Sequence, residues 1–112
     1  MSIKSLIIIV TIAFFSNNAI AQKKEVLNIP DTTMKINVVE VSCGQCKFNM
    51  QGSGCELAVR IDGNPYFVDN TKIDEHGDAH AKNGFCESIR KAEVQGKMID
   101  NRYKVSYFKL LP

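Results

Sequence analysis

Hydrophobic and polar residues alternate along much of this 112-residue chain, which predicts a protein built mainly from β-strands. Residues 34–41 are rich in β-branched side chains and are expected to form the first strand. The clearest alternation of apolar and polar residues follows in residues 55–62, and a run of turn-forming residues that includes Gly63 comes at its end. Because a short apolar stretch resumes after that turn, residues 55–69 are expected to form a β-hairpin.

The next segment, residues 69–83, is polar and contains both histidines, His76 and His80. One interpretation is a helix capped at Asp74, in which the two histidines, four residues apart, share a face. A shorter helix capped at Asp78 competes with it, because Gly77 costs up to about 1 kcal/mol inside a helix. On that second interpretation His76 lies outside the helix.

The last third of the chain predicts one ambiguous element and one closing strand. Residues 85–92 carry apolar side chains at helical spacing, whereas residues 92–98 alternate as a strand does. Asp100 and Asn101 suit a two-residue turn into a strand over residues 103–111. We therefore expect an α+β domain of about five strands and one or two short helices.

The N-terminus has the pattern of an export signal. Lys4 provides a positive start, an apolar run follows over residues 6–15, and Ala19 and Ala21 match the small residues that precede a cleavage site. Residues 1–21 are expected to be a signal peptide that delivers a secreted or periplasmic protein, with an uncleaved anchor as the alternative. No later stretch approaches the roughly 20 apolar residues of a membrane span, so none is expected after cleavage.

The expected mature chain consists of a flexible leader over residues 22–33 and a single domain over residues 34–112. Removing Lys4 from the 14 basic and 12 acidic side chains of the whole sequence leaves a net charge of +1. That balance argues against binding to nucleic acid, which requires a basic surface. A domain of this size has a marginal core, so a covalent or metal cross-link is expected to stabilise it.

The four cysteines permit three disulfide pairings, and sequence alone does not choose among them. A bridge from Cys55 to Cys86 closes a loop of roughly 30 residues and could contribute about 3.7 kcal/mol, against about 2 kcal/mol for Cys43 to Cys46. We therefore expect Cys55 and Cys86 to form the structural disulfide. Cys43 and Cys46 are then available for other chemistry.

Cys43, Cys46, His76 and His80 form a candidate metal site, because thiolates and imidazoles are ligands for zinc and for copper. The leading hypothesis is a non-enzymatic exported binding protein that carries this site. A disulfide-stabilised module that binds another protein or an envelope component, without metal, is the first alternative. The second is a thiol-disulfide redox protein in which Cys43 attacks and Cys46 resolves.

A string of short motifs runs through the chain: Cys43-Gly44-Gln45-Cys46, Gly54-Cys55, Ala58-Val59-Arg60-Ile61-Asp62-Gly63, Tyr66-Phe67-Val68, His76-Gly77-Asp78-Ala79-His80, Gly84-Phe85-Cys86 and Val94-Gln95-Gly96. Together these motifs resemble a family of small exported bacterial proteins classed only as a domain of unknown function. The resemblance covers about residues 41–111 and implies no activity. Some members of that family carry the name glutaminyl-tRNA synthetase, which does not fit a chain too short for a nucleotide fold and a tRNA platform.

The strand content is also similar to that of small exported proteins with an oligonucleotide-binding-type β-barrel. That likeness implies a mostly antiparallel barrel with one or two short helices. Such a barrel would bring the loop after the first strand close to the later histidine-containing loop. A shared cysteine and histidine site requires that proximity.

Overall fold

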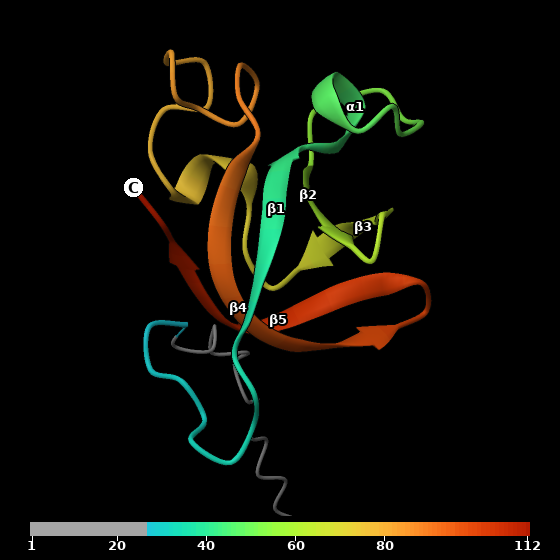
Figure 1. The fold of residues 1–112 in the computed structure, drawn as a ribbon. Coiled ribbons are helices and arrows are strands. Elements are labelled where there is room, and N and C mark those ends of the chain that lie inside the picture. The colour runs from blue at the N-terminus through green and yellow to red at the C-terminus, as the bar shows by residue number, and fades with distance from the viewer. Residues whose placement is uncertain (1–26) are drawn as a thin grey trace, which may run out of the picture.

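The computed structural model describes residues 27–112, which form a small β-barrel (Figure 1). The expected signal peptide, residues 1–21, lies outside the described residues. Among the described residues, no helix is long and apolar enough to cross a membrane. The prediction of a small barrel is confirmed, and two short helical segments accompany its strands.

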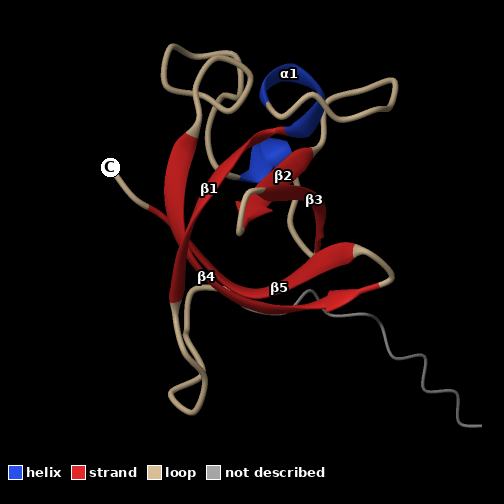
Figure 2. Ribbon diagram, turned by 45° about the vertical axis from the view of Figure 1, so that its right-hand side comes forward, coloured by secondary structure: helices blue, strands red, loops and turns tan. Residues whose placement is uncertain are grey.

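Five strands close the barrel in the order β1-β2-β3-β5-β4. All neighbours are antiparallel except β3 and β5, which run parallel over a short register from Val68 opposite Tyr103 to Asp69 opposite Lys104. Figure 2 shows the long β4 and β5 curving beneath the shorter strands. The strands are β1 (Asn37–Cys43), β2 (Leu57–Ile61), β3 (Asn64–Asp69), β4 (Arg90–Ile99) and β5 (Arg102–Leu110).

Both expected hairpin turns are present, and their backbone explains their sequence. Asp62 and Gly63 connect β2 to β3 with φ values of 51° and 84°. Asp100 and Asn101 connect β4 to β5 with φ values of 53° and 65°. Two successive positive φ angles match the right-handed twist of the flanking strands, and Gly, Asn and Asp accept them at low cost.

The barrel interior is filled mainly by β-branched and aromatic side chains. Val41, Val59, Val94 and Val105 have no exposed surface. They come from four different strands, so burying them requires the barrel to close. The remaining buried core side chains are Val39, Leu57, Val68, Phe85, Ala92, Tyr103 and Phe108.

The segment between β3 and β4 differs from the expected helix. It contains a single turn of 3-10 helix, η1 (Ile73–Glu75), followed by turns. Gly77 has a φ of 104°, a conformation that an α-helix does not contain, so the helix capped at Asp74 is wrong. Residues 79–83 form turns and bends, so the shorter helix capped at Asp78 is wrong as well. The helical alternative for residues 85–92 is also wrong, because β4 begins at Arg90.

Residues 27–34, most of which were expected to be a flexible leader, are hydrogen-bonded to the barrel. The buried side chain of Gln95 accepts a bond from the backbone N–H of Asp31 at 2.8 Å and donates to the carbonyl oxygens of Asp31 at 2.9 Å and Met34 at 3.0 Å. The Leu27 carbonyl accepts from the backbone N–H of Phe108 at 3.0 Å. These bonds hold the leader against β4 and β5 and satisfy a buried amide.

Replacing Gln95 with Ala should lower the free energy of unfolding by about 1–2 kcal/mol, since three hydrogen bonds are lost and solvent replaces them only in part. Urea unfolding would measure the change, and hydrogen exchange should show faster exchange at Asp31. The matched control is Gln51→Ala, at an exposed glutamine. Equal stabilities for the two variants would contradict a clamping role for Gln95.

A four-cysteine candidate site

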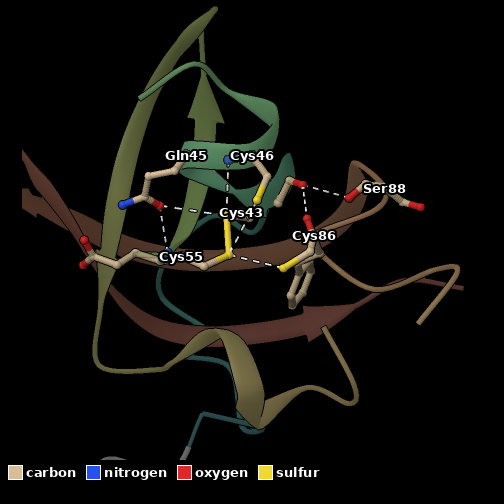
Figure 3. The surroundings of a disulfide bond; sticks show 9 residues. Cys43, Gln45, Cys46, Cys55, Cys86 and Ser88 are labelled. Carbon is tan, nitrogen blue, oxygen red and sulfur yellow. Dashed lines mark hydrogen bonds between the residues drawn. A yellow bond between two sulfur atoms is a disulfide. The ribbon is translucent and has the colours of Figure 1, made fainter. Parts of the chain in front are cut away.

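The four cysteines converge at one end of the barrel, and their sulfur atoms all lie within 4.8 Å of one another (Figure 3). Three separate stretches of chain supply them. Cys43 ends β1 and Cys46 lies in the short helix α1 (Gly44–Lys47), whereas Cys55 precedes β2 and Cys86 lies in the loop before β4. The fold therefore gathers residues up to 43 positions apart in sequence into one cluster.

Cys43 and Cys46 are arranged by the tight turn of α1. Cys43 is fully buried, and its Sγ accepts a hydrogen bond from the backbone N–H of Cys46 at 3.3 Å. Gly44 permits this turn because a Cβ there would approach Met50 Sδ and Phe67 Cε1 to 2.7 Å. The glycine between the two cysteines thus allows the close packing that places both sulfurs in the cluster.

Backbone bonds hold the segment around Cys55 beside this turn. The backbone N–H of Gly44 donates to the Glu56 carbonyl at 2.8 Å, and the backbone N–H of Glu56 donates to Gln45 Oε1 at 2.9 Å. Cys55 is only partly buried although it begins the alternating segment, and the buried part of β2 starts at Leu57. Cys55 therefore lies just before β2, at the rim of the barrel.

Cys86 is positioned by the end of β1. Ser42 Oγ lies 2.7 Å from the Phe85 carbonyl oxygen and 2.8 Å from that of Ser88, and the backbone N–H of Cys43 donates to the Phe85 carbonyl at 3.0 Å. Cys86 Sγ consequently lies 3.2 Å from Cys55 Sγ. Burial raises the pKa of the Cys86 thiol above its ordinary value, and the neighbouring Cys46 raises it further.

The structure joins Cys43 to Cys55 in a disulfide and leaves Cys46 and Cys86 as thiols. This pairing differs from the expected bridge between Cys55 and Cys86. The expectation ranked the pairings by loop-closure entropy alone, which favours the longer loop. The hydrogen bonds of Gly44 and Gln45 to Glu56 instead bring Cys55 to the sulfur at the end of β1.

The two histidines lie outside this sulfur cluster. His76 packs against the ring of Phe108, with centroids 4.4 Å apart, and its Nε2 lies 2.9 Å from Thr71 Oγ1. His80 is exposed, and its backbone N–H donates to the Asp78 carboxylate at 2.9 Å. Because no helix forms here, the spacing of four residues does not align the two rings.

Sequence reasoning placed Cys55 and Cys86 in a purely structural role and did not group them with the Cys43-Cys46 turn. The signal was present, since four cysteines in so short a chain are enough for a complete thiolate site. What the sequence lacked was the contact between β1 and the loop at Phe85, which brings the two pairs together.

Comparison with known proteins identifies the family of this chain but assigns it no activity. Residues 37–111, which span the whole barrel, match the family of unknown function DUF6370. The chain belongs to this family. Searches of the curated proteins and of the solved structures found no match.

Tryptic mapping under non-reducing conditions should recover residues 36–47 linked to residues 48–60, the peptides that hold Cys43 and Cys55. A bridge between Cys55 and Cys86 would instead link residues 48–60 to residues 83–90. Mass spectrometry separates the two products because each cysteine-containing segment ends at a lysine or arginine. Recovery of the second product alone from freshly purified protein would contradict the pairing described here.

Replacing Gly44 with Ala should destabilise the protein by about 1–3 kcal/mol, because the added Cβ overlaps Met50 and Phe67 in a packed turn. The control is Gly54→Ala, since a Cβ at Gly54 meets nothing within 4 Å. Urea unfolding of both variants gives the comparison. A Gly44→Ala protein as stable as the Gly54→Ala control would remove the steric requirement for glycine in the turn.

Proposed function

We propose that this protein is a small exported binding protein whose four cysteine thiolates hold one zinc or copper(I) ion when they are reduced. The convergence of all four sulfurs within 4.8 Å supports the proposal. The earlier candidate set is revised: Cys43 and Cys46 remain, and Cys55 and Cys86 take the places of His76 and His80.

Several features of the cluster suit a thiophilic ion. A tetrahedral zinc site with bonds of about 2.3 Å separates its sulfurs by about 3.8 Å, and Cys46 Sγ lies 3.8 Å from Cys55 Sγ. Two ligands three residues apart on a tight turn, with an N–H donated to the first sulfur, match a common half of zinc-thiolate sites. Four thiolates with no imidazole equally suit copper(I).

Metal binding and the Cys43–Cys55 disulfide exclude each other, because they use the same two sulfurs. The oxidised form therefore favours the alternative function, a disulfide-stabilised module that binds another protein or an envelope component. Export through the expected signal peptide into the periplasm or medium would favour that form. We propose that the redox state of the cluster decides between the two, with no catalytic role needed for either.

The barrel is also consistent with the oligonucleotide-binding type and with an α+β description. Five strands in the order β1-β2-β3-β5-β4, a parallel β3–β5 contact and a helical segment between β3 and β4 support that classification. The fold type does not indicate a function by itself, since one fold serves many activities. The near-neutral charge favours a partner other than nucleic acid.

Fully reduced protein should bind one zinc or copper(I) ion per chain, and loading with cobalt(II) should give the strong visible absorption of a tetrahedral thiolate site. Cys46→Ser and Cys86→Ser should each weaken binding by more than about tenfold, because each removes a ligand. Competition with a chromophoric chelator, under anaerobic conditions, measures the affinities. Alkylation should be blocked at all four cysteines of the loaded protein.

The matched controls are His76→Gln and His80→Gln. Neither residue belongs to the cluster, so both variants should bind metal with unchanged stoichiometry and affinity. Loss of metal binding in either histidine variant would instead support the first hypothesis, a site made of two cysteines and two histidines. Failure of the reduced wild-type chain to bind zinc or copper(I) would leave the disulfide-stabilised module as the function.

A further inference from the structure

A groove runs from the disulfide along the rim of the barrel. Its first part, about 310 Å³, is lined on one side by Cys55 and has Leu57, Val68 and Ile73 as apolar lining. A second part, about 490 Å³, shares Val68 and Thr71 with the first and extends to Arg102. Volumes of this size are typical of sites for small molecules.

The groove is lined by one cysteine of the disulfide and not by the other. Cys55 is part of the lining, whereas Cys43 is fully buried. A thiol that approaches from solvent can therefore attack Cys55 Sγ but has no path to Cys43 Sγ. In disulfide exchange the sulfur that is not attacked becomes the leaving group.

Cys43 is well placed for that leaving role. Its Sγ already accepts a hydrogen bond from the backbone N–H of Cys46 at 3.3 Å, and such a bond stabilises the negative charge that develops when the disulfide breaks. Cys86 Sγ, 3.2 Å from Cys55 Sγ, is in place to attack the same atom in a second step. The roles differ from those expected for a Cys43-Cys46 redox pair.

The charge of the groove selects among small thiols. Its two parts together carry four acidic and two basic side chains, a net charge of −2. Arg102 is engaged by Asp69 at 2.9 Å and by Glu56 at 3.4 Å, which leaves the groove with an excess of carboxylate. A cationic ligand is favoured in such a field and an anionic one disfavoured.

We propose that the groove binds a low-molecular-weight thiol that carries an amine, and that this thiol opens the disulfide at Cys55. The incoming thiolate forms a bond to Cys55 Sγ, the Cys43–Cys55 bond breaks, and its electron pair passes to Cys43 Sγ. A second molecule of the thiol then attacks the sulfur of the first, the bond to Cys55 Sγ breaks, and its electron pair passes to Cys55 Sγ. The two small molecules leave together as a disulfide. Two thiols are oxidised and one protein disulfide is reduced, so electrons and protons balance.

Cys86 provides a second outcome for the mixed disulfide. Attack by its thiolate on Cys55 Sγ releases the small thiol and forms a Cys55–Cys86 bridge, with Cys43 and Cys46 left reduced. The cluster thereby passes between two disulfide isomers without any outside oxidant.

This inference rests on the proposed function in one respect, since opening the disulfide is what makes all four thiolates available to a metal ion. The exchange chemistry itself does not depend on metal. Metal binding by chemically reduced wild-type protein is therefore measured separately, and each proposal can fail while the other stands.

The test uses the full-length chain with Cys46→Ser and Cys86→Ser, which isolates the Cys43–Cys55 disulfide. Cysteamine and mercaptoacetate serve as the cationic and anionic thiols, and N-ethylmaleimide traps the products. Peptide mapping should place the mixed disulfide on Cys55 and the trapped thiol on Cys43. A mixed disulfide mainly on Cys43 would overturn the proposal.

Rates are compared with those of the same thiols on neutral hydroxyethyl disulfide, which corrects for intrinsic reactivity. Relative to that reference, cysteamine should react about 2- to 5-fold faster than mercaptoacetate at low salt, and 0.5 M salt should reduce the difference. Equal corrected rates would overturn binding of an amine-bearing thiol in the groove.

A matched pair of double variants locates the effect. Glu56→Gln with Asp74→Asn neutralises two groove carboxylates and should abolish most of the cysteamine preference. Asp62→Asn with Asp100→Asn changes the net charge equally at the two hairpin turns, where asparagine tolerates the positive φ, and should preserve it. The same preference in both double variants would overturn the assignment to this groove.

Discussion

The end of β1 is the constraint on which the rest of this structure depends. Ser42 and Cys43 adjoin there, and both bond to the carbonyl oxygen of Phe85. Phe85 is itself part of the core, so the loop before β4 is held by packing on one side and by hydrogen bonds on the other. Without that attachment Cys86 would have no fixed distance from the other three sulfurs.

Much of the fold could be predicted because the barrel is built from local signals. The alternation in residues 55–61 and the Asp62-Gly63 and Asp100-Asn101 turns specify hairpins within a few residues, independent of what packs against them. The ambiguity over residues 85–98 had a physical source. Partly exposed residues such as Ile89 and Arg90 follow no single period, and only pairing with β1 and β5 makes β4 a strand.

The candidate site was less predictable, because its geometry comes from contacts between distant segments. The helix expected around His76 and His80 depended on caps and charges, whereas Gly77 adopts a φ of 104° and His76 packs against Phe108. Which disulfide forms depends on which sulfur atoms lie close together in the folded chain. Loop-closure entropy is a property of the unfolded chain and contains no information on those distances. The sequence singled out Cys43 and Cys46 as candidate ligands but did not group Cys55 and Cys86 with them.

Backbone hydrogen bonds hold the segments that carry the four sulfurs, in addition to the disulfide itself. Gly44 to Glu56, Cys43 to Phe85 and Cys86 to Ala79 are backbone bonds of 2.8–3.0 Å, and none of them uses a sulfur atom. Breaking the disulfide therefore leaves the sulfurs close together, which lowers the entropic cost of gathering them around an ion. These sulfur-independent bonds are the physical basis for the proposed exchange of a disulfide for a metal ion.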